Sequence, residues 1–107
     1  MRSLTFLLAF VLPASAWAQT RTLTVSAPSQ VYAGQSFTVT TSASTSAGGG
    51  EQIGFYHCQY STDGGSSWTW FAADHNAGTS VTRNAYITAG GAGSTVVVRA
   101  KPAFRDG

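Results

Sequence analysis

Apolar residues alternate with hydroxyl-bearing residues through most of the chain after residue 20. Alternation places successive side chains on opposite faces of an extended chain, so each such run predicts a strand with one buried face. The clearest example is 36–41, where Phe37 and Val39 alternate with serine and threonine. Runs of this kind, together with one that is apolar on both faces, predict six strands at 22–26, 36–41, 52–60, 68–73, 81–87 and 95–100.

The run 52–60 carries bulky residues on both faces and is the densest in the chain. Strand alternation places Ile53 and Phe55 on one face and Tyr56 and Cys58 on the other. A strand that is apolar on both sides fits the middle of a sheet. We therefore expect 52–60 to be a central strand on which the core is built.

Glycine-rich stretches separate the runs, notably 44–50, which holds three consecutive glycines, and 90–93. No stretch after the first eighteen residues shows a sustained helical period of about 3.6 residues. Short strands that recur roughly every 8–15 residues, with glycine or proline between them, favour two packed sheets. The sequence therefore predicts an all-β, antiparallel β-sandwich.

The first eighteen residues have the three parts of a secretory signal peptide. Arg2 is the charged start, 4–12 is the apolar run, and small residues precede the expected cleavage site at 16–18. Cleavage leaves 19–107 as one domain that is secreted or held at the cell surface. The apolar run is shorter than the about 20 residues that cross a bilayer as a helix, and Pro13 follows it, so no membrane span is expected after cleavage. An uncleaved anchor is the alternative.

Charged residues make up 9% of the chain, against about 25% in an average soluble domain. The chain has six lysines and arginines and four acidic residues, and Arg2 falls in the predicted signal peptide. The exported part therefore has a net charge near +1, spread along the chain. Such a charge is too weak to attract a polyanion, so we expect no nucleic-acid partner.

Cys58 is the only cysteine, which excludes a disulfide within the chain. It lies in the apolar run 52–60, where we expect a buried small hydrophobic residue. Pairing between chains and a reactive thiol are the alternatives. His57 adjoins Cys58 but should point to the opposite face of the strand, so it is not expected to activate the thiol.

Ser61, Asp63, Gly65 and Trp68 follow the spacing Ser-x-Asp-x-Gly-x-x-Trp between two aromatic-rich runs. Asp63 can accept hydrogen bonds from turn amides and Gly65 can adopt a positive φ, so the segment predicts a structural β-hairpin, with Trp68 packed against the core. The spacing resembles the Asp-box of sialidase propeller blades, which in that family is a structural hairpin remote from the catalytic centre. A single copy, without an arginine triad or a tyrosine–glutamate pair, leaves only a remnant of such an enzyme as a hypothesis.

The first strands resemble those of bacterial immunoglobulin-like and fibronectin-type-III-like modules, in the order Leu23-x-Val25, Pro28, Val31, Gly34-Gln35 and Phe37-x-Val39. The resemblance covers nearly all of 19–107 and implies an immunoglobulin-like β-sandwich. Such domains usually have about seven strands, and six are predicted here, so the last strand is expected to be missing. Either the chain is a truncated piece of a longer secreted protein, or an edge is left open for another chain to complete.

Residue types that catalyse reactions or bind metals are scarce and scattered. His57 and His75 are the only histidines, and no Gly-x-Ser-x-Gly sequence is present. The acidic residues lie in predicted turns or near the end of the chain, which does not place a carboxylate pair across a cleft. The turn 74–76 with Glu51 offers fewer oxygen ligands than the about six to eight that calcium needs. We expect no enzyme activity, no cofactor and no metal site.

The aromatic residues carry the remaining functional signal. We expect one tryptophan of the predicted 68–73 strand to be exposed, where it could stack on a sugar ring, anchor a partner protein or be covered by a missing strand. Trp70, Phe71 and Tyr86 are therefore the candidate ligand-binding residues.

Together these patterns predict a non-catalytic structural or adhesion module within a larger secreted or cell-surface protein. Its partners would be neighbouring domains or other surface proteins. The alternative is a carbohydrate-binding module that holds a polysaccharide on exposed aromatic residues.

Overall fold

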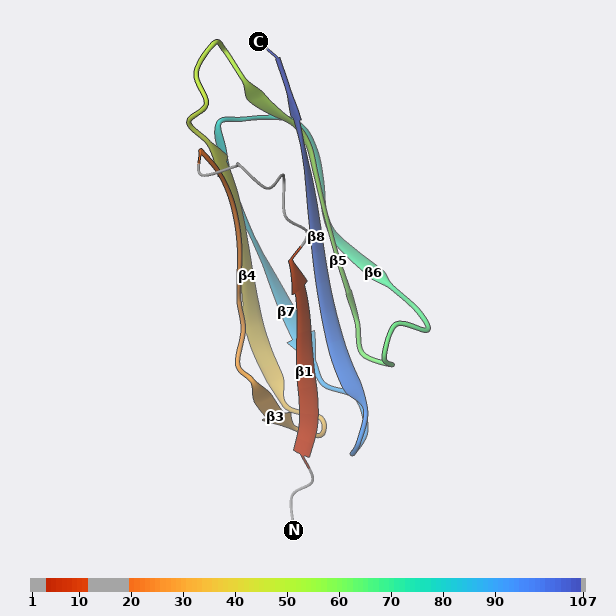
Figure 1. The fold of residues 1–107 in the computed structure, drawn as a ribbon. Coiled ribbons are helices and arrows are strands. Elements are labelled where there is room, and N and C mark those ends of the chain that lie inside the picture. Colours follow the sequence, from red (N-terminus) through yellow and green to blue (C-terminus); the bar gives the residue numbers. More distant parts are fainter. Residues whose placement is uncertain (1–3, 12–19, 107) are drawn as a thin grey trace.

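The computed structural model describes residues 4–11 and 20–106, which form eight strands and no helix (Figure 1). No helix that could cross a membrane is therefore found in these two ranges. The predicted cleavage site at 16–18 lies outside the described residues. The strands are β1 (Leu4–Val11), β2 (Arg21–Ser26), β3 (Gln30–Tyr32), β4 (Ser36–Thr45), β5 (Gln52–Ser61), β6 (Thr69–Gly78), β7 (Ser80–Thr88) and β8 (Thr95–Arg105).

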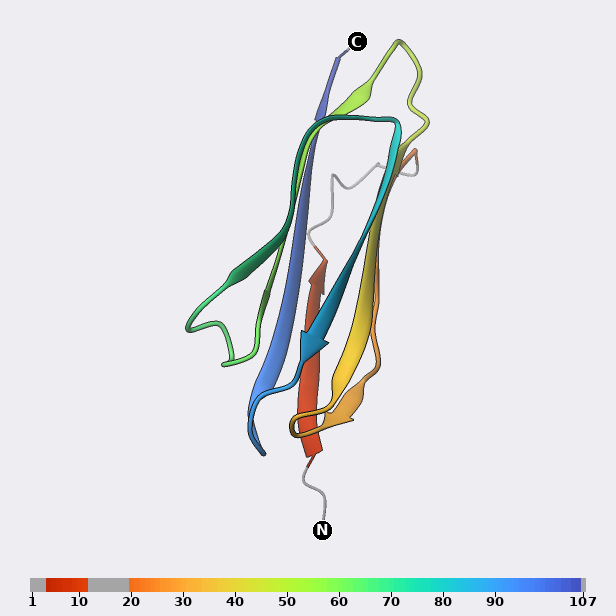
Figure 2. The same ribbon diagram turned by 180° about the vertical axis from the view of Figure 1, so that it is seen from behind.

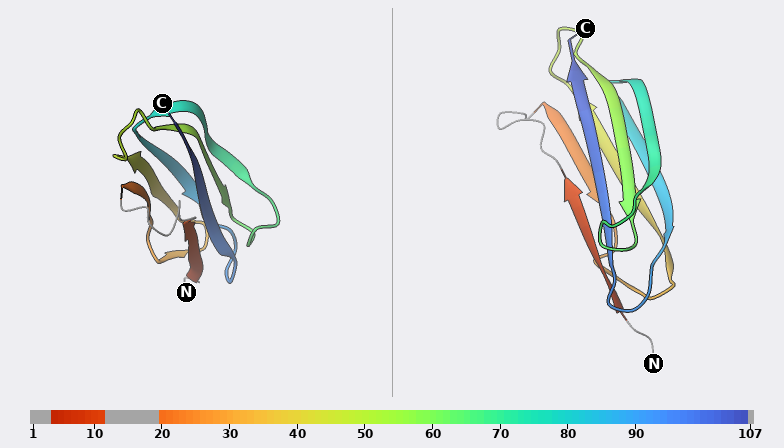
Figure 3. Two further views of the ribbon diagram at one scale, coloured as in Figure 1. Left: turned by 45° about the horizontal axis from the view of Figure 1, so that its top comes forward. Right: turned by 90° about the vertical axis from the view of Figure 1, so that its right-hand side faces the viewer.

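The strands form two sheets that face each other, as seen from opposite sides in Figures 1 and 2. One sheet has the order β3-β1-β8-β5-β6, and the other has the order β2-β4-β7. The right-hand view of Figure 3 looks onto β1, β8, β5 and β6 of the larger sheet. Every pairing is antiparallel except that of β1 with β8, which is parallel. The prediction of an all-β sandwich is confirmed.

All six predicted strands are present, as β2 and β4 to β8, and β5 lies inside its sheet, between β8 and β6, as expected. β8 continues beyond its predicted end, through Pro102 to Arg105. Pro102 lies after Ala100, the last residue of β8 that pairs with β1, so within residues 4–11 and 20–106 β8 has a neighbour on one side only at Pro102. Such an edge tolerates a residue that lacks an N–H group.

Two further strands were not predicted. β3 has only three residues, too few for an alternating pattern to be recognised. β1 is the apolar run that was assigned to the signal peptide, and it lies between β3 and β8. The structure describes the conformation of this segment and does not test its removal on export, which stays a prediction.

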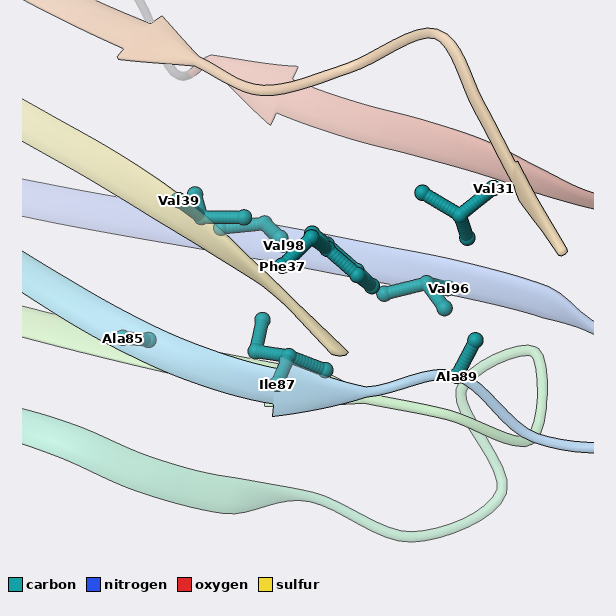
Figure 4. Packing of buried hydrophobic residues seen from close by; sticks show 8 residues of the cluster. All are labelled: Val31, Phe37, Val39, Ala85, Ile87, Ala89, Val96 and Val98. Carbon is teal, nitrogen blue, oxygen red and sulfur yellow. The ribbon is translucent and has the colours of Figure 1, made fainter. Parts of the chain in front are cut away.

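The core between the sheets consists of two clusters of buried residues. The first, drawn in Figure 4, is aliphatic apart from one phenylalanine and contains Val31, Phe37, Val39, Ala85, Ile87, Ala89, Val96 and Val98. The second contains Ala43, Ile53, Tyr56, Cys58, Ala72, Val81 and Ala100. Phe71 packs against both clusters, so the two form one continuous core.

The predicted alternation in β5 is wrong at its start, because the strand contains a bulge. The pairing register of β5 shifts between Ile53 and Phe55 toward both of its neighbours. Ile53 and Tyr56 are therefore both fully buried, whereas simple alternation placed them on opposite faces. Gly54 occupies the bulge, where an added Cβ would lie 3.1 Å from Cδ of Arg105. The close approach explains why a glycine fits this position.

An ion pair ties the first strand of the smaller sheet to the loop before β5. Arg21 donates hydrogen bonds to both carboxylate oxygens of Glu51, with Nε 3.0 Å from Oε2, and Thr45 donates a third. These bonds, chiefly those from Arg21, lower the pKa of Glu51 from 4.5 to about 2. The ionised carboxylate is thus the form that the folded chain favours.

We expect the domain to lose stability as the pH falls from about 5 to about 2, since Glu51 takes up a proton more readily in the unfolded chain. The variant Glu51→Gln should show a shallower loss over this range. Urea unfolding at a series of pH values measures the free energy of unfolding of the parent and of the variant. Equal pH dependence in the variant and the parent would contradict the role of Glu51.

Cys58 is a free thiol that is fully buried in the second core cluster. Its Sγ lies 3.4 Å from the hydroxyl of Thr41, which is also buried. Burial raises the pKa of the Cys58 thiol, which keeps it in the less reactive protonated form. The prediction of a buried, hydrophobic cysteine is confirmed.

We therefore expect a disulfide reagent such as Ellman's reagent to leave Cys58 unmodified in the folded chain and to modify it fully in concentrated guanidinium chloride. The matched control is Ala73→Cys, because Ala73 is exposed on β6. This variant should react rapidly at one thiol while folded. Rapid reaction of the parent would show that Cys58 is accessible and could pair between chains.

Candidate ligand-binding face

The turn between β5 and β6 is held by side-chain hydrogen bonds, as its sequence predicted. The Ser61 hydroxyl donates to Oδ1 of Asp63 at 2.6 Å and accepts a bond from the Gly65 amide at 2.9 Å. Asp63 accepts two more bonds from Ser67, from its amide at 2.9 Å and its hydroxyl at 2.6 Å. These donors, with that of Ser61 foremost, hold the pKa of the Asp63 carboxyl well below its usual value. The carboxylate is thus a fixed structural element of the turn.

The backbone of this turn requires glycine and is anchored to β8. Gly64 and Gly65 have φ values of 72° and 101°, in the region that side chains disfavour. The Gly64 amide donates a hydrogen bond of 2.9 Å to the carbonyl of Thr95 at the start of β8. The hairpin therefore has a fixed position relative to β8.

Trp68 does not pack against the core, contrary to the prediction. It is half-buried, and the guanidinium carbon of Arg99 lies 3.6 Å from the centroid of its ring. Arg99 is an exposed residue between the core residues Val98 and Ala100 of β8, so it lies on the outer face of the sheet. The turn places Trp68 on that face, where a cation–π contact holds it.

A row of rings crosses the same outer face over β5 and β6. The rings of Phe55 and His57 stack with centroids 4.4 Å apart. His57 also makes edge-on contacts with two further rings. The centroid of its ring lies 5.4 Å from that of Trp70 and 5.8 Å from that of His75. We call Phe55, His57, Trp70 and His75 the aromatic row.

Strand pairing explains how residues up to 20 positions apart come together. After the bulge, β5 directs Tyr56 and Cys58 inward, so the intervening His57 lies on the outer face. Phe55 pairs directly with His75, and Gln59 pairs directly with Trp70. Adjacent strands place such partners about 5 Å apart, which is within contact distance for rings.

Positive charge borders the aromatic row on the β8 side. Arg99 and Lys101 are exposed on β8 and pair with Gln59 and His57 of β5. Arg99 also donates a hydrogen bond of 2.7 Å to the side chain of Gln59. The face thus offers exposed rings, one amide and two cations, which suits a neutral or acidic polar ligand that has an apolar surface.

The three residues predicted to bind a ligand lie in different places. Trp70 is 56% exposed and belongs to the aromatic row. Phe71 is half-buried and packs against the core. Tyr86 is 75% exposed on β7, in the other sheet. The structure thus brings Trp70 together with Phe55, His57 and His75, and it brings neither Phe71 nor Tyr86 to them.

Sequence reasoning missed three members of the row for two reasons. The bulge at Gly54 disguised the phase of β5, so Phe55 and His57 could not be placed reliably from alternation. His75 was assigned to a turn, whereas β6 continues to Gly78. The sequence His-Asn-Ala-Gly does favour a turn, and pairing with Phe55 overrides that preference.

Apart from His57 and His75, whose rings meet in the aromatic row, the polar residues considered for a metal site or catalysis lie apart from one another among the described residues. Arg83 engages Asp74 through Nε at 2.8 Å and Nη2 at 2.7 Å, and its bonds lower the pKa of the Asp74 carboxyl. Glu51 is held by Arg21. Within residues 4–11 and 20–106, no three histidine, cysteine or acidic side chains are grouped so that they could hold a metal ion.

No protein family, curated protein or solved structure matches this chain. The geometry of the described residues is therefore the basis for assigning a function.

Proposed function

We propose that residues 19–107 form an exported, immunoglobulin-like module that serves as a structural or adhesive part of a secreted or cell-surface protein. The observation that carries the proposal is the distribution of the six predicted strands between the sheets. The first, second and fifth lie in one sheet, and the third, fourth and sixth lie in the other. Immunoglobulin-like sandwiches likewise keep the first, second and fifth strands in one sheet and the third and sixth in the other.

The outer face of the smaller sheet supports a structural role. Hydroxyl groups pair across β4 and β7, with Ser36 2.9 Å from Thr88 and Ser42 2.9 Å from Thr82. Thr40 similarly donates to Asn84 at 2.8 Å. Such a neutral, hydrogen-bonded surface suits an extracellular module.

Export is tested by expressing the full chain in a bacterium and determining the amino-terminal sequence and location of the product. We expect a chain that begins at Gln19 and is found outside the cytoplasm. A cytoplasmic product that retains Met1 would overturn the proposal of an exported module.

The alternative function, carbohydrate binding, has one specific observation in its favour. Trp70 is exposed at one end of the aromatic row, next to His57, and could stack on a sugar ring while His57 and Gln59 bind hydroxyl groups. A glycan array would identify a polysaccharide that the purified protein binds. A module without sugar affinity would bind none of the glycans.

For any glycan that binds, we expect Trp70→Ala to weaken the affinity by about two- to tenfold, since a ring-stacking contact contributes about 0.5–1.5 kcal/mol. Tyr86→Ala is the matched control, because Tyr86 is equally aromatic and exposed but lies on the other sheet. It should bind like the parent. Unchanged affinity of Trp70→Ala for every glycan would exclude the aromatic row as the binding site.

A further inference from the structure

We propose that the place of β1 is a strand-acceptor site, which in the exported protein binds one extended, apolar segment of a partner polypeptide. This inference rests on the proposed function in one respect, namely that export removes the first eighteen residues and β1 with them. The domain that remains then has a gap within its larger sheet.

β1 lies between two strands that do not pair with each other. It pairs antiparallel with β3 over three residues and parallel with β8 over six, from Phe6 opposite Thr95 to Val11 opposite Ala100. β1 is the only sheet neighbour of β3 among the described strands. Without β1, the edges of β3 and β8 face each other across about 10 Å, which is two strand spacings and the room that one strand needs.

The residues of β3 and β8 that border this gap include residues of the core. Val31 of β3 lies opposite Thr5, and Val96 and Val98 of β8 lie opposite Leu7 and Ala9. All three valines are buried and belong to the first core cluster, in which they lie between the sheets (Figure 4). Loss of the neighbouring strand would open this side of the cluster to water as well as leaving two backbone edges unpaired.

The composition of β1, which fills the gap in this structure, indicates what kind of segment could bind there. Leu4–Val11 contains no charged residue and only one polar residue, Thr5. A segment that fills the same gap must therefore be extended, about eight residues long and apolar, and it gains backbone hydrogen bonds from both sides. A charged segment would have to desolvate its charges against the valines.

The direction of β1 favours a segment from another polypeptide over a strand that follows β8 in the chain. A strand joined to β8 by a short hairpin must run antiparallel to it, whereas β1 runs parallel. A second copy of the chain could also pair its own β8 with the free edge of β8. The β3 of the first copy would then stand in its way, because β3 lies on the other side of the gap. The gap therefore selects a single inserted strand.

The test starts from the full chain with a protease recognition sequence in place of residues 13–18, produced without export. After cleavage, we expect the segment carrying β1 to remain bound, as native mass spectrometry would show. Incubation near the unfolding midpoint with a labelled Leu4–Val11 peptide, bearing a lysine tail for solubility, should exchange the label into the complex. The same peptide with Leu8→Pro is the control, because proline breaks the backbone ladder, and it should not exchange.

Removal of the segment should lower the melting temperature by more than about 10 °C or cause self-association, and the peptide should reverse either effect. Three outcomes would overturn the proposal: an unchanged melting temperature without the segment, equal uptake of the proline peptide, or a stable dimer that the peptide does not dissociate. The last outcome would identify a second copy as the occupant.

A disulfide test checks the direction of the inserted strand. A peptide with cysteine in place of Phe6 should crosslink to the variant Thr95→Cys if it enters parallel to β8, and to Arg99→Cys if it enters antiparallel. Cys58 is buried and should not compete. These experiments use unexported protein, so strand uptake is measured independently of export, and retention of Met1 would contradict the proposed function without affecting the result.

Discussion

Alanine in place of Tyr56 will lower the free energy of unfolding by about 3–5 kcal/mol, a large part of the stability of a domain of this size. Tyr56 is the largest fully buried side chain in the described part of the protein. It lies on the central strand β5 and packs in the second core cluster with Ile53 and Cys58. The substitution removes a buried ring and leaves a cavity that the surrounding strands can fill only in part. Urea unfolding followed by tryptophan fluorescence measures the loss.

The matched control is Tyr86→Ala, which makes the same chemical change at a position that is 75% exposed. It should alter the free energy of unfolding by no more than about 0.5 kcal/mol. Similar unfolding midpoints for the two variants would mean that Tyr56 is not in a packed core. A larger loss in Tyr86→Ala would instead point to an interaction surface on β7.

The strands that sequence analysis identified are those with a long apolar period. β4 and β7 show why this works, since each has one buried face and one hydroxyl-rich face, and a period of two is visible over nine or ten residues. β3 has three residues and no visible period. The apolar run of β1 fits a signal peptide and a buried strand equally well, because both need uninterrupted apolar residues.

The candidate site was harder to predict than the fold, because its residues depend on register. Trp70 could be singled out from its strand alone. His57 and His75 come together only when the pairing of β5 with β6 is known, and the bulge at Gly54 shifts that pairing. Trp68 was expected to pack against the core as the last residue of the hairpin motif, whereas the turn places it on the outer face, where Arg99 contacts its ring.

Alanine in place of Ser61 will lower the free energy of unfolding by about 1–3 kcal/mol, the second-largest effect that we expect. Ser61 is almost fully buried, and its hydroxyl joins Asp63 to the Gly65 amide. The substitution removes only a hydroxyl group, but it leaves the Gly65 amide without its acceptor and the Asp63 carboxylate without one of its two bonds of 2.6 Å. Urea unfolding measures the loss, and fluorescence of Trp68 reports whether the turn moves.

Ser66→Ala is the control, since Ser66 is exposed in the same turn and should contribute little. Equal stability of the two variants would contradict the role of the Ser61 hydroxyl. The comparison also bears on ligand binding, because this turn sets where β6 begins and hence where Trp70 meets His57. If Ser61→Ala shifts the fluorescence of the tryptophans while the chain stays folded, the turn acts as the support of the aromatic row. In that case Ser61→Ala should also weaken any affinity for sugars, although Ser61 is buried and lies outside the aromatic row.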